Sequence, residues 1–248
     1  MKLKGKNAII TGANRGIGKA TLEIFAKNGA NIWACSRREN DEFSKFIESI
    51  KKLYNVNVYP VYFDLNNEEE IKQAAKKIVA SKKKIDILVN NAGIAYNALF
   101  NMTSINNLKE VFQINFFSQV LLTQIISRIM IKQKSGSIIN IASVGGIEAN
   151  KGYLAYGSSK AAVIWETRCL AKELGIYNIR VNAIAPGLVN TDMGYIKSDE
   201  EIKKVINRTP LNRMADIDEI TKAILFLASD DASYINGEIL KIDGGRCC

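Results

Sequence analysis

Short apolar runs rich in β-branched residues alternate along the chain with longer segments in which apolar residues recur at helical spacing. We expect strands at residues 7–11, 31–36, 56–63, 85–90, 137–143, 180–185 and 238–242. Most of these runs are continuously apolar, which is typical of parallel strands buried on both faces. Because helical segments separate the strands and parallel crossovers are right-handed, the alternation predicts an α/β fold with one doubly wound sheet. Ligands bind such sheets at the carboxyl ends of the strands.

No linker-like segment and no internal repeat interrupts the 248 residues, so we expect one domain over residues 1–248. The chain contains no histidine. This absence excludes Ser-His-Asp and Cys-His activation of a nucleophile, and zinc sites with imidazole ligands. We therefore expect no metal site, and proton chemistry must use Tyr, Lys, Asp, Glu or Cys side chains.

The net charge of +9 comes from 34 Lys+Arg against 25 Asp+Glu, and the lysines form short local runs rather than one basic tail. This pattern favours a solvated basic surface. The alternative is a site that attracts anionic partners, such as a phosphorylated cofactor or an acidic carrier protein. No basic motif interleaved with aromatic residues indicates nucleic-acid binding.

The four cysteines show no spacing typical of metal ligands or a disulfide framework, which favours a reducing, cytoplasmic setting. The adjacent Cys247 and Cys248 predict a frayed, oxidisable tail; a reactive or lipidated pair is the alternative. The N-terminus leads directly into the first predicted strand, so we expect no signal peptide. Residues 111–131 are the most apolar long stretch, but polar side chains interrupt it, so we predict a partly buried helix and no membrane span.

A glycine-rich loop follows the first predicted strand and opens the first helix. It reads Thr11-Gly12-Ala13-Asn14-Arg15-Gly16-Ile17-Gly18. Gly12 permits a tight turn, Gly16 lets the backbone approach a pyrophosphate at the helix N-terminus, and Gly18 allows close packing of helix on strand. A plain glycine-rich turn is the alternative, but the placement between strand and helix is the one that dinucleotide binding requires.

The end of the second predicted strand indicates which dinucleotide binds. An acidic residue there would accept a hydrogen bond from the ribose 2′-hydroxyl of NAD. The chain instead has Ser36, Arg37 and Arg38, and Arg37 can hold a 2′-phosphate by charge-assisted hydrogen bonds. Arg15 in the glycine loop can reach the same region. The sequence thus favours NADP(H) over NAD(H), while a solvated surface position remains open for Arg38.

Tyr156 and Lys160 lie four residues apart, so on a helix they share one face. A phenol titrates near pH 10, and a nearby cation favours the phenolate. Tyr156 can therefore exchange a proton with a carbonyl or alcohol oxygen without any histidine. In isolation this spacing is common, and a surface pair is the alternative.

Two further motifs end predicted strands at the sheet edge where ligands bind: Ser143, and the run Asn90-Asn91-Ala92-Gly93. With the glycine loop and the Tyr/Lys pair, in this order and at these intervals, they resemble the short-chain dehydrogenase/reductase family from Lys6 to Gly245. The resemblance implies a single Rossmann domain with a seven-stranded parallel sheet and helices on both faces.

The resemblance also implies a catalytic tetrad of Asn115, Ser143, Tyr156 and Lys160. In the family mechanism Tyr156 is the general acid of the reductive direction, and Ser143 hydrogen-bonds the substrate oxygen. Lys160 lowers the pKa of Tyr156 and holds the nicotinamide ribose. Asn115 supports a water that links Lys160 to solvent; a polar residue that kinks a helix is the alternative reading of Asn115.

Other positions match cofactor contacts of the family. Asp64 and Leu65 resemble the pair beside the adenine, residues 91–93 line the adenosine, and Asn90 braces the sheet. Segment 186–191 resembles the one that meets the nicotinamide carboxamide, through the Val189 backbone and the Thr191 hydroxyl. The expected cofactor-binding residues are Gly12, Asn14, Arg15, Gly16, Ile17, Gly18, Ser36, Arg37, Asp64, Leu65, Asn91, Ala92, Gly93, Tyr156, Lys160, Pro186, Gly187, Val189 and Thr191.

Three functions remain open. Within the family, the length and segment 140–146 are most similar to enzymes that use NADPH to reduce 3-oxoacyl thioesters on acyl carrier protein. The basic residues expected for docking that carrier are only partly present, at Lys132 and Lys134, and segment 147–153 is more charged than an acyl channel needs. An oxidoreductase of a sugar, nucleotide sugar, polyol or other secondary alcohol is the alternative. A protein that binds NADPH as a sensor or scaffold, with little turnover, is a third reading.

Residues 188–214 form a long connection with a helical pattern at residues 199–206, and we expect them to be the substrate lid. The helices expected at residues 108–131 and 156–174 form the dimer face in relatives, often within a homotetramer. Both are apolar enough here to allow such an assembly.

Overall fold

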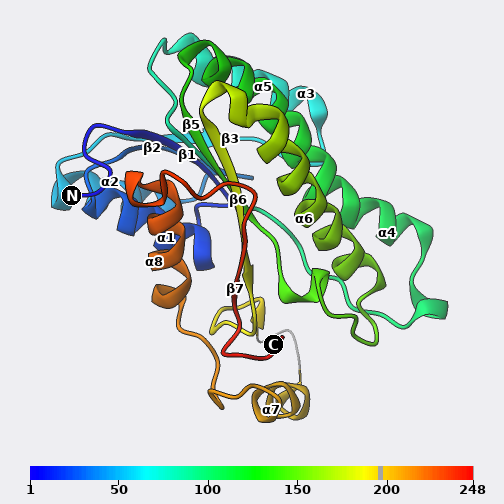
Figure 1. The fold of residues 1–248 in the computed structure, drawn as a ribbon. Coiled ribbons are helices and arrows are strands. Elements are labelled where there is room, and N and C mark those ends of the chain that lie inside the picture. Colours follow the sequence, from blue (N-terminus) through cyan, green and yellow to red (C-terminus); the bar gives the residue numbers. More distant parts are fainter. Residues whose placement is uncertain (195–197, 248) are drawn as a thin grey trace.

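A single parallel sheet organises the chain in the computed structural model, which describes residues 1–194 and 198–247 (Figure 1). Its strand order is β3-β2-β1-β4-β5-β6-β7, and every pairing is parallel. This is the doubly wound, seven-stranded fold that the sequence and the resemblance predict. The strands are β1 (Asn7–Thr11), β2 (Asn31–Ser36), β3 (Val58–Tyr62), β4 (Ile87–Asn90), β5 (Gly136–Ile141), β6 (Ile179–Pro186) and β7 (Ile239–Ile242).

Five of the seven strands differ from their predicted bounds by one or two residues at an end. The fourth apolar run was expected to pair from Ile85, but the Ile85 N–H donates to the Gln133 side chain (3.0 Å) and the Asp86 carboxylate accepts from the Asn7 N–H (2.9 Å). β4 begins at Ile87, just after Asp86, whose N–H donates to the Asn7 carbonyl and whose carbonyl accepts from the Ser137 N–H (both 2.9 Å). The third strand spans residues 58–62 rather than 56–63, and the fifth spans 136–141 rather than 137–143. The sixth spans 179–186 rather than 180–185, and the seventh begins at 239 rather than 238.

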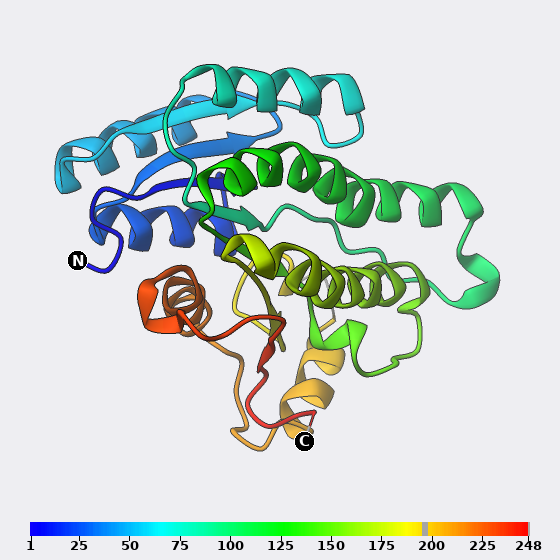
Figure 2. The same ribbon diagram turned by 45° about the horizontal axis from the view of Figure 1, so that its top comes forward.

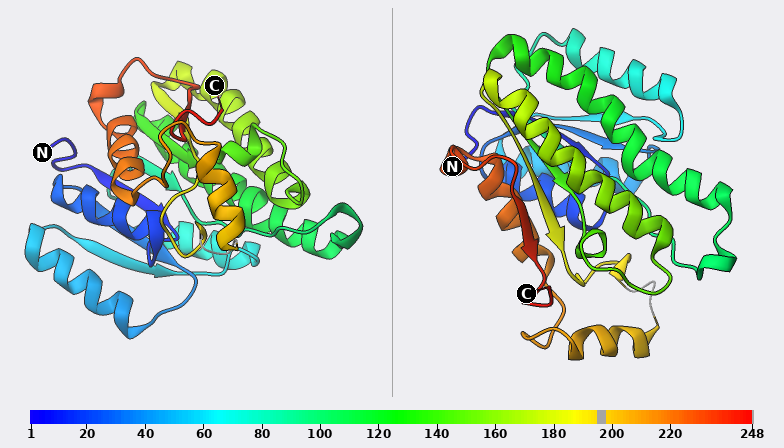
Figure 3. Two further views of the ribbon diagram at one scale, coloured as in Figure 1. Left: turned by 90° about the horizontal axis from the view of Figure 1, so that it is seen from below. Right: turned by 45° about the vertical axis from the view of Figure 1, so that its right-hand side comes forward.

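Helices cover both faces of the sheet in two layers (Figures 2 and 3). One layer holds α1, α2 and α8, and the other holds α3, α4, α5 and α6 (Figure 1). α7 lies apart from both layers, near the C-terminus (Figure 1). The helices are α1 (Gly16–Lys27), α2 (Asp41–Tyr54), α3 (Glu68–Ala80), α4 (Ile105–Phe112), α5 (Ser118–Gln133), α6 (Leu154–Leu174), α7 (Asp199–Asn207) and α8 (Ile217–Ala228). Short helical turns are η1 (Phe100–Met102), η2 (Gln113–Phe117), η3 (Val144–Gly146), η4 (Gly175–Tyr177) and η6 (Asp230–Ala232).

The helix starts show how local sequence sets the elements. The Asn40 side chain accepts from the Phe43 N–H at the start of α2, and Asn67 and Ser104 cap α3 and α4 in the same way. Such caps satisfy N–H groups that have no partner within a helix. α1 differs, because Arg15 at its N-cap makes no side-chain capping bond. The N–H groups at the start of α1 are therefore free of a protein side chain that would compete with a ligand.

The apolar stretch predicted as one long helix is helical from Ile105 to Gln133, with a π-helical turn, η2, between α4 and α5. By length and composition this is the one helix in the described part of the chain that could cross a membrane, and half of its most apolar window is buried. α5 packs against α3 and against the sheet. A core helix meets the same criteria of length and composition, and this packing supports the prediction of a partly buried helix.

The C-terminal tail contradicts the prediction of a frayed end. The Cys247 N–H donates to the Asp243 carboxylate (2.8 Å), and the Lys241 ammonium donates to the Cys247 carbonyl. The Cys247 side chain is partly buried. The tail is thus bonded to the body of the protein as far as Cys247, whereas Cys248 lies outside the described residues. Residues 195–197 of the predicted lid also lie outside them.

Candidate active site

A cavity of about 580 Å³ opens at the carboxyl ends of the strands. The strand order changes direction between β1 and β4, so the loops after these two strands diverge to opposite faces and leave a crevice. The cavity is lined by residues that follow β1, β2, β3, β4, β5 and β6. The sheet edge predicted from sequence is therefore the place where the candidate residues meet.

The glycine loop forms a backbone cradle at one end of this cavity. Gly12 has a positive φ of +66°, and a Cβ there would lie 2.9 Å from the Asn91 Nδ2 atom. A Cβ on Gly18 would lie 2.1 Å from the Gly12 carbonyl oxygen. The Asn91 amide also donates to the Thr11 carbonyl (2.9 Å). These contacts hold the loop tight against the start of α1, whose uncapped N-terminus suits an anionic pyrophosphate.

The edge of the cavity beside β2 carries the residues that would distinguish the two dinucleotides. The hydroxyl of Ser36 donates to the Arg38 carbonyl (3.0 Å), which shapes the turn after β2. Arg37 and Arg15 line the cavity with exposed side chains, and Arg38 is not part of the lining. Two guanidinium groups at this edge can bind a 2′-phosphate. Within the described residues, β2 contributes no carboxylate to the cavity lining.

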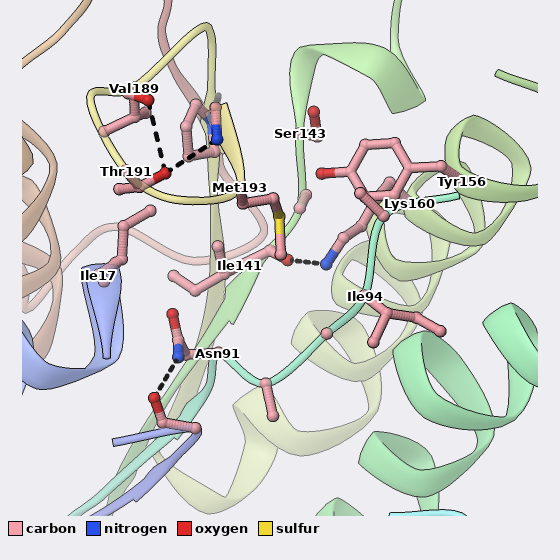
Figure 4. Close-up of a pocket in the computed structure, with 18 of the residues that line it drawn as sticks. Ile17, Asn91, Ile94, Ile141, Ser143, Tyr156, Lys160, Val189, Thr191 and Met193 are labelled. Atoms are coloured by element: carbon pink, nitrogen blue, oxygen red, sulfur yellow. Dashed lines mark hydrogen bonds between the residues drawn. The ribbon is translucent and has the colours of Figure 1, made fainter. Parts of the chain in front are cut away.

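The other end of the cavity brings together Ser143, Tyr156 and Lys160 (Figure 4). Ser143 lies two residues after the end of β5 and caps η3, where its hydroxyl oxygen accepts from the Gly145 N–H (3.0 Å). Tyr156 and Lys160 lie one turn apart near the start of α6. The Lys160 ammonium donates to the Ile141 carbonyl at the end of β5 (2.6 Å). A hydroxyl, a phenol and an ammonium thus face one space.

Burial changes the titration of both ionisable groups. Burial raises the pKa of Tyr156, the Ser143 hydroxyl opposes this rise, and Tyr153 adds to it. Burial also lowers the pKa of Lys160 to about 8. The lowering of the Tyr156 pKa by Lys160 remains a prediction, since the ammonium donates to the Ile141 carbonyl here and burial, the largest influence on the phenol, raises that pKa. The phenol is therefore held in its protonated form, the form that donates a proton.

Asn115 does not line the cavity, although it was expected in the tetrad. It is fully buried in the π-helical turn η2, where its side-chain oxygen accepts from the Ile94 N–H (2.8 Å) and its amide donates to the Ile94 carbonyl (2.9 Å) and the Ser159 hydroxyl (3.0 Å). A Cβ on Gly93 would lie 3.0 Å from the Asn115 side-chain oxygen and 3.5 Å from the Lys160 ammonium. Asn115 thus stands behind Lys160, and its irregular helical turn agrees with the alternative reading of a helix distortion.

The segment after β6 borders the same space. The Thr191 hydroxyl accepts from the Gly194 N–H (3.2 Å) and lies 3.5 Å from the Val189 carbonyl (Figure 4). A Cβ on Gly187 would lie 2.9 Å from the Asp243 Cα atom, so this glycine permits close approach to the chain after β7. All the expected site residues line the cavity except Gly18, which packs behind the loop, and Asn115.

Asn90 stays out of the cavity, as predicted, and braces the sheet. Its buried amide donates to the Thr123 hydroxyl and to the Asn140 side-chain oxygen (both 2.9 Å). These bonds tie β4 to β5 and α5.

Several lining residues were not predicted individually. Ile94 follows the Asn-Asn-Ala-Gly run, Met193 lies in the predicted lid, and Arg246 comes from the C-terminal tail. Tyr153 and Asn150 were expected only as members of segment 147–153. No local pattern marks Arg246, because the fold alone brings the last residues of the chain to the cavity.

A dinucleotide cradle at one end of a cavity, and a phenol beside a hydroxyl and an ammonium at the other, define a Rossmann-type oxidoreductase that works with a nicotinamide cofactor. A family model described as enoyl-(acyl carrier protein) reductase matches residues 12–246. The chain is 40% identical over 247 residues to the 3-oxoacyl-(acyl-carrier-protein) reductase FabG of Thermotoga maritima, covering 99% of both chains. The chain belongs to the short-chain dehydrogenase/reductase family, and it is an oxidoreductase of carbonyl or CH–OH groups.

Relatives with different substrates are almost as similar. The L-xylulose reductase of Caenorhabditis elegans is 38% identical over 243 residues, which is 97% of this chain and 95% of that one. Among solved structures, a 7α-hydroxysteroid dehydrogenase complexed with NADH and 7-oxo glycochenodeoxycholic acid has a TM-score of 0.92 at 35% identity, covering 98% of this chain and 95% of that one. Members of the family that are similar to this chain thus act on different substrates.

Proposed function

We propose that this protein reduces the carbonyl of a 3-oxoacyl thioester to a secondary alcohol, with NADPH as reductant. The observation that carries the proposal is the phenol of Tyr156, held in its protonated form beside the Ser143 hydroxyl in the cavity. The similarity to a 3-oxoacyl-(acyl-carrier-protein) reductase over nearly the whole chain supports this substrate.

The residues of the chain act on the substrate oxygen. Ser143 donates a hydrogen bond to the carbonyl oxygen and stabilises the negative charge that develops on it. Tyr156 donates its phenolic proton to that oxygen as general acid. Lys160 supplies positive charge next to the phenolate that is left, and Asn115 supports the path by which the proton is replaced from solvent. The bound dinucleotide supplies the hydride.

The cavity fits NADPH at its other end. The close contacts at Gly12 and Gly18 leave a backbone cradle that a Cβ would fill, and the N-terminus of α1 is free of a side-chain cap. Asp64, Leu65 and residues 91–93 line the adenosine part, and Pro186, Gly187, Val189 and Thr191 line the nicotinamide part. Arg15 and Arg37 bind the 2′-phosphate.

A reductase of a sugar or other polar alcohol is the second candidate. Glu148, Asn150 and Arg246 form hydrogen-bonded polar contacts next to the cavity, and Asn150 and Arg246 belong to its lining. An acyl channel does not need such groups, whereas a polyhydroxylated substrate can bond to them. The identity to an L-xylulose reductase supports this reading.

One assay distinguishes the candidates. NADPH oxidation is followed by absorbance with acetoacetyl-CoA and with L-xylulose side by side at equal concentrations. Faster turnover of acetoacetyl-CoA by at least about tenfold supports the proposal, since one good polar contact changes specificity by such a factor. Faster turnover of L-xylulose supports the second candidate. No turnover of any carbonyl acceptor, together with NADPH binding, supports the third reading of a sensor or scaffold.

The remaining expectations belong to the same proposal. Acyl carrier protein is the carrier of the substrate and docks on the basic surface that includes Lys132 and Lys134. The protein acts in the cytoplasm as a homotetramer built on the faces of α4, α5 and α6. Residues 188–214, which include α7, are the substrate lid. Sedimentation velocity tests the tetramer.

A further inference from the structure

Three segments that are far apart in sequence meet at one carboxylate. Glu148 lies in the connection between β5 and α6, Arg208 follows the end of α7, and Arg246 lies in the C-terminal tail. One Glu148 oxygen accepts from the Arg208 guanidinium (2.7 Å), and the other accepts from Arg246 Nε (3.1 Å). Arg246 also donates to the Asn150 side-chain oxygen (3.1 Å). We call Glu148, Arg208 and Arg246 the Glu148 cluster.

The cluster is too buried to be an ordinary surface ion pair. The side-chain exposure is 8% for Arg246 and 27% for Glu148, against 63% for Arg208. Burial acts to raise the pKa of Glu148, but the two arginines outweigh it and lower that pKa, so the carboxylate is charged at neutral pH. Without this carboxylate, Arg246 would be a buried cation held only by an amide oxygen, which is costly.

The position of the cluster connects it with the cavity. Arg246 and Asn150 line the cavity, and so does Val205 of α7. α7 lies apart from the two helical layers, beside the C-terminus (Figure 1). The Arg208 contact with Glu148 therefore ties the end of α7 to the segment that leads into α6, the helix that carries Tyr156 and Lys160.

We propose that Glu148 is a positioning residue: by binding Arg208 and Arg246 together, it holds α7 and the C-terminal tail in place as the substrate-side wall of the cavity. The carboxylate touches neither the cofactor cradle nor the reacting oxygen. Glu148 fixes the position of α7 and the C-terminal tail, and it therefore affects substrate binding rather than proton transfer. The kinetic part of the test rests on the proposed function, whereas the exchange part does not.

Hydrogen exchange with mass spectrometry tests the placement of α7 in the full chain with NADPH present. Glu148→Gln keeps the size of the side chain but removes its charge, and we expect the amides of residues 200–207 to exchange about tenfold faster, as the loss of one charge-assisted contact allows. Glu48→Gln is the matched control, since Glu48 pairs with Lys51 on the exposed face of α2. Unchanged exchange in Glu148→Gln overturns the proposal.

A second variant covers the case in which Glu148→Gln folds poorly. Arg208→Gln removes the exposed partner and leaves the buried pair with Arg246 intact. We expect a smaller increase in exchange, about threefold, confined to α7, because exposed pairs are weaker. The double variant Glu148→Gln with Arg208→Gln should match Glu148→Gln alone. Additive effects of the two changes contradict a shared contact.

Kinetics with acetoacetyl-CoA provide the second readout. We expect Glu148→Gln to raise KM about tenfold with kcat within about twofold and with NADPH affinity unchanged, because only uniform substrate binding is lost. Glu148→Asp should recover part of the KM. A fall in kcat at constant KM contradicts a positioning role. If the unmodified protein does not reduce acetoacetyl-CoA, the proposed substrate fails, and the exchange experiment still decides the role of Glu148.

Discussion

The Lys160 ammonium donates a hydrogen bond of 2.6 Å to the carbonyl oxygen of Ile141, the last residue of β5. Ser143 follows two residues later, and Tyr156 lies one turn before Lys160 on α6. This bond therefore joins the strand that delivers the hydroxyl to the helix that delivers the phenol. The same bond engages the Lys160 ammonium, which the sequence predicts to lie beside the phenol of Tyr156.

The pH dependence of turnover should report Lys160 rather than Tyr156. Because burial lowers the pKa of Lys160 to about 8, the ammonium loses its proton as the pH rises through that value. Burial raises the pKa of Tyr156, so the phenol stays protonated over the same range. We expect the rate of reduction to fall above about pH 8. The Lys160→Arg variant keeps its positive charge over this range, so its rate of reduction should not fall near pH 8, whatever its absolute rate. A fall near pH 8 that persists in this variant contradicts the assignment to Lys160.

Tyr156→Phe should lower kcat by about 10²- to 10⁴-fold, the usual contribution of a positioned general acid. NADPH affinity, measured by fluorescence titration, should change little, because the ring remains. Tyr153→Phe is the matched control: Tyr153 lines the cavity and its ring lies 6.0 Å from that of Tyr156. Near-normal turnover in Tyr156→Phe would show that another group supplies the proton.

Arg37→Ala should weaken NADPH binding about 10- to 100-fold, the value of one or two charge-assisted hydrogen bonds. NADH lacks the 2′-phosphate, so its dissociation constant should change less than about threefold. Arg38→Ala provides the comparison, since Arg38 lies next in the chain but outside the cavity lining. Equal losses for both dinucleotides, measured by calorimetry, would contradict the preference for NADPH.

Gly18→Ala should destabilise the protein by about 3 kcal/mol or more, because backbone contacts as close as those at Gly18 cannot relax as a flexible side chain does. The new Cβ would lie 2.1 Å from the Gly12 carbonyl oxygen. Gly5→Ala is the comparison: Gly5 has a φ of +75° but no atom within 4 Å of its Cβ position. Its cost should be about 1–2 kcal/mol from backbone strain alone. Urea unfolding of the two variants checks the order, and equal costs would mean that the loop relaxes.

Stability should depend on pH through Glu166. Burial raises the pKa of Glu166 to about 7, and the Gln119 amide, which donates to one of its oxygens (2.6 Å), opposes this only partly. The folded state therefore holds a proton that the unfolded state releases at lower pH. The free energy of unfolding should fall as the pH rises from about 4.5 to about 7, by at most about 3 kcal/mol, and stay level above.

Glu166→Gln removes this titration and should flatten the dependence in that pH range. Glu173→Gln, on the exposed side of the same helix, should leave it as in the unmodified protein. Chemical unfolding at pH 5, 6, 7 and 8 measures the difference. A slope that survives in Glu166→Gln would assign it to other groups.

Local sequence patterns predict much of the fold. The period of the apolar residues separates strands from helices because a strand buried on both faces is apolar throughout, whereas a helix needs only a stripe. The seven predicted strands are present, and β1 and β2 have the predicted bounds. The sequence also determined, by containing no histidine, that the proton donor had to be another group, and the spacing of Tyr156 and Lys160 placed them on one helical face.

Other features depended on contacts between residues distant in sequence. Only the folded chain decides that β5 accepts the Lys160 hydrogen bond and that burial raises the pKa of Tyr156, since burial is a property of packed elements. The meeting of Arg208 and Arg246 at Glu148 has no local pattern, because these arginines lie 60 and 98 positions from Glu148 in the chain. Local periodicity specifies which element forms, and tertiary packing specifies which charges become neighbours and how much water they keep.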